Sequence, residues 1–385
     1  MSNAQELLQE RLELREDLVA HKVPGRVPMY LRFSAEAACG LAGVDLMRAH
    51  YDIELMEKAY TAVCDTFVSD ANPCSNIRFP ASYQLLGARN WILSSSGVMQ
   101  HPEIEIMQAE EYDEYTAEPY TFIVEKLLPR ACGALDKSPA ENMLAFARAQ
   151  DSYRQDSAKH GAVMAKLNQK YGYGPGMAVG GGMIEAPFDF LADQLRGFKG
   201  ILMDVRKRPE KIEEAIEATL PLMVKLGTPA KIAPGATNFC PLHLAPYING
   251  KAFERLWWPS FLEMSKQLDA KGVGINHYCE QDFTRYGEFL AQMPTSNSFL
   301  FEDGDYAQLK KTAGKDHVIG GFYDPTITLV KTKEECIDAA KRLLDVCMEG
   351  GQYYFAFDKT VMDSKSIDTP KLVAVVEWVR DNAKY

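Results

Sequence analysis

Eight short apolar or β-branched segments recur along this chain, and helix-like segments separate most of them. These segments are VPMYLRF (27–33), TFVSDAN (66–72), GMAVGGG (176–182), ATNFCPLHL (236–244), GVGINHY (272–278), SFLFED (298–303), HVIGGF (317–322) and YYFAFDK (353–359). Strands that are mostly apolar on both faces and alternate with helices are typical of a parallel sheet covered by helices. Eight such units close a (β/α)8 barrel. We therefore predict an α/β fold, a (β/α)8 TIM barrel.

A doubly wound open sheet is the structural alternative. Such folds open on a strand–GxGxxG–helix unit that binds a dinucleotide, and the start of this chain contains none. The barrel is therefore favoured. Helix boundaries are also readable, because Pro209 suits the first turn of a helix over 209–227, and Thr332 with Glu335 can form a capping box for a helix over 333–349.

The region 73–175 departs from this alternation. Its first part is typical of loops and a hairpin, and 138–172 is typical of one long helix. We predict that 73–175 is an insertion after the second strand that covers one end of the barrel. Because no linker-like segment or internal repeat is visible, residues 1–385 are expected to form a single domain.

Composition limits the classes of partner. The 385 residues are 46% hydrophobic and carry a formal net charge of −11, which argues against a nucleic-acid binder. No apolar run approaches membrane-spanning length, and the first residues form a charged amphipathic pattern without the apolar core of a signal peptide. The eight cysteines contain no CxxC pair and are typical of reduced, buried thiols. We expect a cytoplasmic protein, with a homodimer as one possible assembly.

The fifth segment continues into a set of metal-binding residue types. GVGINHYCEQD (272–282) places His277, Cys279 and Glu280 at a predicted strand end, and imidazole, thiolate and carboxylate are the ligands of catalytic zinc. Residues two apart on a strand share a face, so His277 and Cys279 could bind one ion together. Glu280 could join them only where the strand has become loop. The alternative is a core histidine and a buried free cysteine beside a solvated glutamate.

In barrel enzymes the active site lies at the carboxyl ends of the strands. Strand ends five and six together offer a histidine, a cysteine and two glutamates, the second of them Glu302, which strengthens the prediction of a metal site. Arg32 is a candidate for holding a substrate carboxylate through paired hydrogen bonds. The other candidates for substrate binding at predicted strand ends are Phe33, Asp70, His243, Tyr278, Tyr323 and Asp358. His243 is equally well explained as a hydrogen-bonded histidine at a turn.

Several longer stretches resemble the uroporphyrinogen-decarboxylase superfamily. They are QHPEIEIMQAEEYDEY (100–115), APFDFLADQLRGFKGILMDVRKRPEKI (186–212), EMSKQLDAKGVGINHYCEQ (263–281), GGFYDP (320–325) and GGQYYFAFDK with DTPKLVAVVEWV near the end of the sequence. The resemblance covers nearly the whole chain and implies a (β/α)8 barrel. The superfamily divides into metal-free decarboxylases and zinc-dependent methyltransferases that work with corrinoid proteins. The decarboxylases carry an arginine-rich segment after strand one, where this chain has Arg32 alone, so the resemblance disfavours decarboxylation.

Two methyltransferase branches remain. The branch that transfers methyl groups from methylcobalamin to thiols has a His-x-Cys pair, which His277 and Cys279 match, and a later cysteine that is replaced here by AFDKT around Asp358. The branch that demethylates methoxylated aromatics has a glutamate after strand five and another after strand six, which Glu280 and Glu302 match. This similarity implies zinc held mainly by Glu280 and Glu302, with His277 and Cys279 competing as third ligand.

The resemblance thus implies an O-demethylase-type methyltransferase. It would move a methyl group from a methoxylated substrate, expected to be aromatic, to the Co(I) of a cobalamin carried by a partner corrinoid protein. Zinc would act as a Lewis acid on the leaving oxygen, and carboxylate ligands would keep it electrophilic. Phe33, Tyr278 and Tyr323 are candidates for sandwiching the ring. A methylcobalamin:thiol methyltransferase, a metal-free decarboxylase of the uroporphyrinogen type and a noncatalytic small-molecule-binding barrel are the alternatives.

Overall fold

The computed structural model describes residues 3–75 and 78–385, which divide into two compact units. Unit 1 contains the described residues up to Ser75 together with 158–179 and 276–385. Unit 2 contains 78–157 and 180–275. The predicted insertion 73–175 does not coincide with either unit, because its last residues belong to unit 1.

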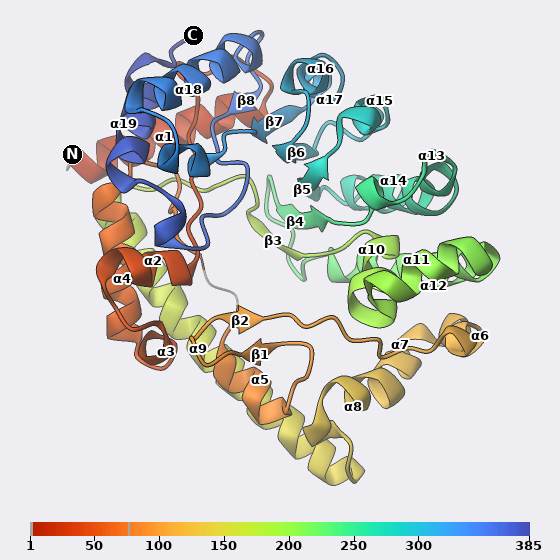
Figure 1. Ribbon diagram of the computed structural model, residues 1–385. Coiled ribbons are helices and arrows are strands. Elements are labelled where there is room, and N and C mark those ends of the chain that lie inside the picture. Colours follow the sequence, from red (N-terminus) through yellow and green to blue (C-terminus); the bar gives the residue numbers. More distant parts are fainter. Residues whose placement is uncertain (1–2, 76–77) are drawn as a thin grey trace. The chain divides into compact units, whose positions relative to one another are not determined.

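The central strands run parallel, as the sequence predicts. They are β3 (Gly180–Met183), β4 (Thr237–Leu242), β5 (Gly274–Asp282), β6 (Ser298–Asp303), β7 (Val318–Gly321) and β8 (Tyr353–Tyr354), hydrogen-bonded in that order (Figure 1). Unit 2 contributes β3, β4 and the first two residues of β5, and unit 1 contributes the others. The predicted hairpin in unit 2 is also present, as the antiparallel pair β1 (Ile92–Leu93) and β2 (Met99–Gln100).

The first two predicted strands are not formed as continuous strands. Among the described residues, segment 27–33 makes isolated parallel bridges, from Met29 to Phe355 and from Phe33 to both Cys74 and Val361. Segment 66–72 is shortened because α4 (Ile53–Thr66) continues to its first residue, and Ala71 alone bridges, to Gly174. Proline at 28 and at 73 has no N–H group to donate, so neither position can extend a ladder on its donor side.

Helices make up most of the remaining regular structure of each unit (Figure 1). In unit 1 they are α1 (Asn3–Val19), α2 (Ala35–Ala42), α3 (Leu46–Ala49), α4, α15 (Gly287–Leu290), α16 (Tyr306–Lys311), α17 (Ala313–Asp316), α18 (Lys333–Cys347) and α19 (Thr369–Asn382). In unit 2 they are α5 (Pro80–Leu86), α6 (Tyr112–Ala117), α7 (Pro119–Phe122), α8 (Leu128–Ala131), α10 (Pro187–Phe190), α11 (Gly197–Lys207), α12 (Pro209–Leu226), α13 (Gly250–Ala252) and α14 (Trp258–Asp269). The predicted long helix is α9 (Pro139–Tyr171).

Local sequence signals fix several helix ends. The Oγ1 atom of Thr332 accepts from the N–H of Glu335, and the Glu335 carboxylate accepts from the N–H of Thr332, which completes the predicted capping box at the start of α18. Pro209 stands at the first position of α12, as predicted. Among the described residues, no helix is both long enough and apolar enough to cross a membrane.

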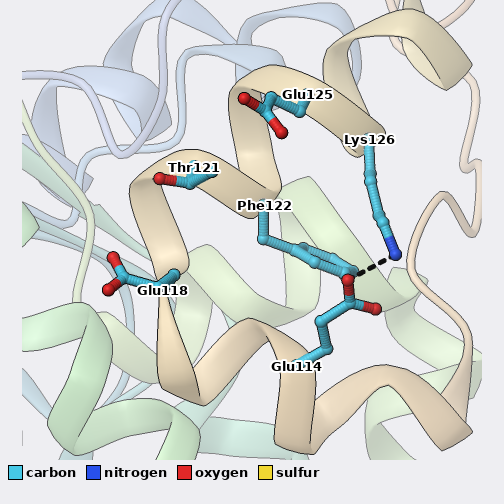
Figure 2. Close-up of a pocket in the computed structure, with 6 residues that line it drawn as sticks. All are labelled: Glu114, Glu118, Thr121, Phe122, Glu125 and Lys126. Atoms are coloured by element: carbon cyan, nitrogen blue, oxygen red, sulfur yellow. Dashed lines mark ion pairs between the residues drawn. The ribbon is translucent and has the colours of Figure 1, made fainter.

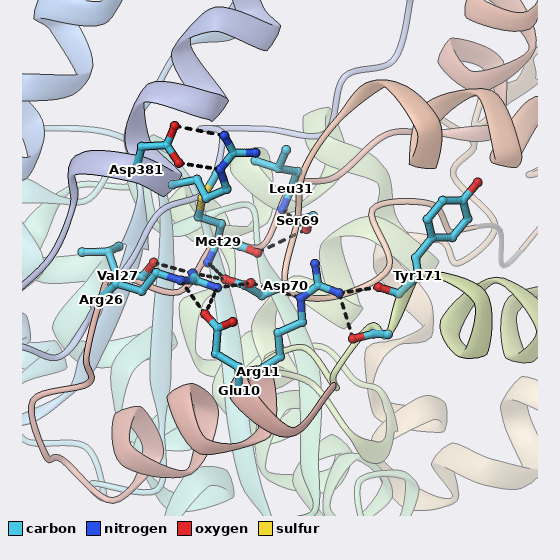
Figure 3. A network of polar contacts seen from close by, with 12 residues as sticks. Glu10, Arg11, Arg26, Val27, Met29, Leu31, Ser69, Asp70, Tyr171 and Asp381 are labelled. Atoms are coloured by element: carbon cyan, nitrogen blue, oxygen red, sulfur yellow. Dashed lines mark hydrogen bonds and ion pairs between the residues drawn. The ribbon is translucent and has the colours of Figure 1, made fainter. Parts of the chain in front are cut away.

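Asp70 lies at the centre of a buried ion-pair network in unit 1 (Figure 3). Its carboxylate accepts from the Nη1 and Nη2 atoms of Arg26, each at 2.8 Å, from Nε of Arg11 at 3.3 Å and from the N–H of Met29 at 2.7 Å. Arg11 also donates to the carbonyl oxygens of Tyr171 and Gly172, and so links α1 to the end of α9. The predicted substrate-binding role of Asp70 is therefore not supported, because internal donors surround a carboxylate that is only 3% exposed.

Candidate active site

Strand β5 places the predicted metal ligands on its two opposite faces. The strand continues to Asp282, so Cys279 and Glu280 point to opposite faces. His277 and Cys279 lie on the face that carries Phe299 and Phe301 of β6. Tyr278 lies on the other face together with Glu280, and it packs against a buried cluster of unit 1 that includes Leu300. The structure therefore does not bring the four predicted ligands together.

The buried face gives His277 and Cys279 the environment of core residues. The ring of His277 stacks on Phe299 with 5.2 Å between centroids, and its Nε2 atom lies 2.8 Å from Oδ1 of Asn297. Burial lowers the pKa of His277 to about 3 and raises the pKa of the Cys279 thiol well above its usual range. A thiol that keeps its proton is a poor metal ligand, since the thiolate is the binding form.

On the opposite face, Arg32 is the central group of the candidate site. Its guanidinium lies over the ring of Tyr278, 4.7 Å from the centroid, in a cation–π contact. Its Nε and Nη2 atoms are buried and have no hydrogen-bond partner. Burial lowers the pKa of Arg32, while Tyr278, Tyr354, Glu280 and Asp358 raise it through their charges. Two guanidinium nitrogens of this kind have the geometry to donate paired hydrogen bonds to a carboxylate.

Carboxylates and one lysine complete this site. The Nζ atom of Lys359 lies 2.9 Å from Oε1 of Glu302, and Oε2 of Glu302 accepts from the N–H of Gln281 at 2.8 Å. Gln281 has a φ of 65°, and the pairing of β5 with β6 is irregular between Cys279 and Asp282. Glu302 thus stabilises a bulge at the carboxyl end of β5, a position where bulges commonly redirect side chains.

Asp358 is the acid of this site that titrates near neutral pH. Burial raises its pKa to about 7, although the neighbouring Lys359 lowers it. One of its oxygens, Oδ1, accepts from the N–H of Lys359 at 2.6 Å, and Oδ2 lies 3.6 Å from the Lys359 ammonium. A carboxyl group that is half protonated at neutral pH can donate a proton to a leaving oxygen.

This raised pKa predicts how Asp358 affects stability. The unfolded chain releases the Asp358 proton near pH 4, at a pKa of about 3.9, whereas the folded chain keeps it until about pH 7. The folded state therefore binds more protons over that interval, and the free energy of unfolding falls as pH rises through it. We therefore expect the free energy of unfolding of Asp358→Asn to rise relative to that of the wild type as pH increases from 4 to 7. Above pH 7 the difference between the two proteins should stay constant. Urea unfolding of both proteins at pH 5, 6, 7 and 8 measures this, and a difference that does not change with pH would contradict it.

The described residues do not fit the predicted zinc site. His277 and Cys279 face away from Glu280, and both oxygens of Glu302 already have partners. In the part of the chain that the structure describes, no three His, Cys, Asp or Glu side chains are arranged to hold a metal ion. Zinc at Glu280 and Glu302 would require the Lys359 ammonium to leave Glu302.

The other predicted site residues lie elsewhere. Phe33 is fully buried and stacks on Phe67, with centroids 4.6 Å apart, and Tyr323 is 2% exposed and donates its hydroxyl to the carbonyl oxygen of Cys336. Of the three aromatic residues expected to sandwich a ring, Tyr278 is the one whose ring contacts the Arg32 guanidinium. His243 belongs to unit 2. Lys359, which directly follows Asp358 at a predicted strand end, is not among the predicted site residues but pairs here with Glu302.

A small pocket on unit 2 is not part of this chemistry. It has a volume of about 80 Å³ and is lined by Glu114, Glu118, Thr121, Phe122, Glu125 and Lys126 (Figure 2). Lys126 forms an ion pair with Glu114 there, and both side chains are exposed. None of the site residues predicted from the sequence lines it.

Comparison with known proteins assigns a class of fold. No model of a known protein family and no curated protein matches this chain. Solved structures share its α/β fold. One of them is a methyltransferase from Methanosarcina mazei, which aligns with a TM-score of 0.56 over 97% of this chain and 98% of its own, at 12% sequence identity.

Proposed function

We propose that this chain is a methyltransferase that takes a methyl group from a methoxylated carboxylic acid and passes it to the Co(I) of a partner corrinoid protein. The observation that carries this proposal is Arg32, whose two buried, unpartnered nitrogens need an anionic ligand. The shared fold with a methyltransferase is a second support. We also propose that the bridges made by segments 27–33 and 66–72 complete a (β/α)8 barrel.

In this proposal the chain's own residues bind the substrate and move a proton. Arg32 holds the substrate carboxylate through paired hydrogen bonds, and Tyr278 supplies an aromatic surface beside it. The corrinoid of the partner protein supplies the nucleophile for the methyl carbon. As the methyl–oxygen bond breaks, its electron pair goes to the leaving oxygen, and the Asp358 carboxyl donates a proton there. Lys359 then lies beside the Asp358 carboxylate and stabilises its charge.

Binding and transfer can be measured separately. We expect 4-methoxybenzoate to bind, and methoxybenzene, which lacks the carboxylate, to bind at least about 30-fold more weakly, corresponding to about 2 kcal/mol. Calorimetry measures binding, and the absorbance of a Co(I) corrinoid protein reports methyl transfer. Equal binding of the two compounds contradicts the role of Arg32. Carboxylate-dependent binding without transfer from a panel of methoxylated acids contradicts the methyltransferase.

A metal-free decarboxylase is the second candidate, and a specific observation favours it. A buried arginine that binds a carboxylate and a carboxyl acid with a pKa of about 7 need no metal ion to decarboxylate a substrate. Release of carbon dioxide from a bound carboxylic acid, without loss of a methyl group, identifies this activity.

The zinc expectation leads to its own prediction. Because the Lys359 ammonium occupies Oε1 of Glu302, we expect Lys359→Ala to bind zinc at least about tenfold more tightly than the wild type, and Glu280→Ala in that background to lose the gain. Competition with a chromophoric chelator measures the affinities. Lys315→Ala, which removes an exposed lysine of unit 1, is the matched control. Stoichiometric, tight zinc in the wild type that Lys359→Ala does not change would contradict this interpretation of Lys359.

A further inference from the structure

Unit 2 contains a second group of ionisable side chains, which the function proposed above does not use. The segment around α10 and the π-helical turn η4 (Leu191–Arg196) places three carboxylates four residues apart, at Glu185, Asp189 and Asp193. His243, which follows β4, lies against them. Short π-helical turns are frequent at functional sites. The four-residue spacing of these acids is visible in the sequence EAPFDFLAD.

Each carboxylate has a distinct set of partners. Asp189 is fully buried and accepts from Nε1 of Trp257 at 2.7 Å and from the N–H of His243 at 2.9 Å, so it positions the chain after β4. Asp193 lies 2.5 Å from Nδ1 of the His243 ring. Oε1 of Glu185 accepts from Gln194 at 2.8 Å, but its Oε2 atom is buried and has no partner. A buried carboxylate oxygen without a donor indicates a ligand that supplies one.

The charges around Glu185 indicate which ligand that is. Burial and the charge of Asp193 raise the pKa of Glu185 to about 7, and burial and Asp193 likewise raise the pKa of Asp189 to about 7. The interaction with His243 lowers the pKa of both acids. The cluster therefore has more acid than base, and a bound cation would relieve this imbalance.

Aromatic side chains lie at the edge of this cluster. Asp193 and His243 act electrostatically on His101, whose ring stacks on Trp91 with 4.2 Å between centroids. Arg78 lies over the Trp91 ring at 4.0 Å, so His101 and Arg78 together cover the faces of the Trp91 ring. The ring of His101 is therefore the aromatic group that borders the carboxylates, and such a border is a suitable environment for an organic ammonium ion.

We propose that Glu185, Asp193 and His243 of unit 2 form a binding site for a small organic ammonium ion. The ammonium donates to Oε2 of Glu185 and is held by the negative charge of the cluster, while Asp193 fixes the orientation of the His243 ring. The site stands independently of the methyltransferase proposal, because none of its residues takes part in that chemistry.

Calorimetry with benzylammonium as the probe and benzyl alcohol as its neutral analogue tests this site. We expect the ammonium to bind at least about tenfold more tightly than the alcohol, and Glu185→Gln to remove most of that preference. Asp193→Asn is a second variant, and it is also expected to weaken binding of the ammonium. Glu213→Gln, which changes a half-exposed glutamate of unit 2 paired with Arg255, is the matched control and is expected to leave binding unchanged.

Three results would overturn the proposal. One is equal binding of benzylammonium and benzyl alcohol to the wild type. Another is a charge preference that survives in Glu185→Gln and in Asp193→Asn when urea unfolding shows both variants to be folded. The third is equal weakening by the Glu213→Gln control, which would assign the binding to general negative charge rather than to this cluster.

Discussion

Replacing Asp70 by alanine is expected to lower the free energy of unfolding by about 3–5 kcal/mol. The substitution removes the acceptor of Arg26 and Arg11, whose side chains are 15% and 7% exposed, and also that of the Met29 N–H. Two largely buried cations then remain close together without their shared carboxylate. The loss is larger than that of a surface ion pair because the guanidinium groups cannot regain full hydration in the folded state.

Urea unfolding of Asp70→Ala against the wild type measures this loss. Asp381→Ala is the matched control, because Asp381 also pairs with an arginine, Arg380, but is 59% exposed, and we expect it to cost less than about 1 kcal/mol (Figure 3). Asp70→Asn keeps one acceptor oxygen and the side-chain shape, so its loss in free energy of unfolding should lie between those of Asp70→Ala and Asp381→Ala. An Asp70→Ala variant as stable as Asp381→Ala would show that the network contributes no more than exposed pairs do.

Replacing Arg32 by methionine is expected to change stability and binding in opposite directions. Methionine has a similar length and no polar atoms, so it removes two buried nitrogens that have no acceptor, and we expect a gain of about 1–2 kcal/mol in the free energy of unfolding. The same change removes the only guanidinium proposed to hold the substrate carboxylate. Binding of 4-methoxybenzoate is expected to weaken at least about 30-fold.

The combination of these two effects distinguishes a binding arginine from a structural one. Truncating an arginine with a structural role, such as Arg26, is expected to lower the free energy of unfolding of the protein. Truncating a residue that serves binding often raises it, because such residues are retained for function although they destabilise the fold. Arg342→Met, in the exposed face of α18, is the control and should change neither quantity. Calorimetry and urea unfolding on the three proteins measure both effects. An Arg32→Met variant that is destabilised and still binds the acid would exclude Arg32 as the carboxylate-binding residue.

Much of the secondary structure was predictable from the sequence because its signals are local. The capping box of Thr332 and Glu335, the helix start at Pro209 and the parallel strands β3 to β8 follow from neighbouring residues or from periodicity. The failures at 27–33 and 66–72 share one cause. These segments are strand-like in composition, but side chains such as Asp70 and prolines near their ends take the place of ladder hydrogen bonds.

The sequence by itself determined the alternation of strands and helices, the helix ends and the residue types at the strand ends. Only the tertiary structure decided which of those residues meet. The pairing register of β5 with β6, in which Cys279 lies opposite Phe301, assigns Cys279 to the core and Glu280 to the Arg32 side, and a shift of one residue would reverse this. Pairing of Glu302 with Lys359, and of Asp70 with Arg11 and Arg26, joins residues far apart in sequence. Such contacts depend on packing over the whole unit, and no local pattern encodes them.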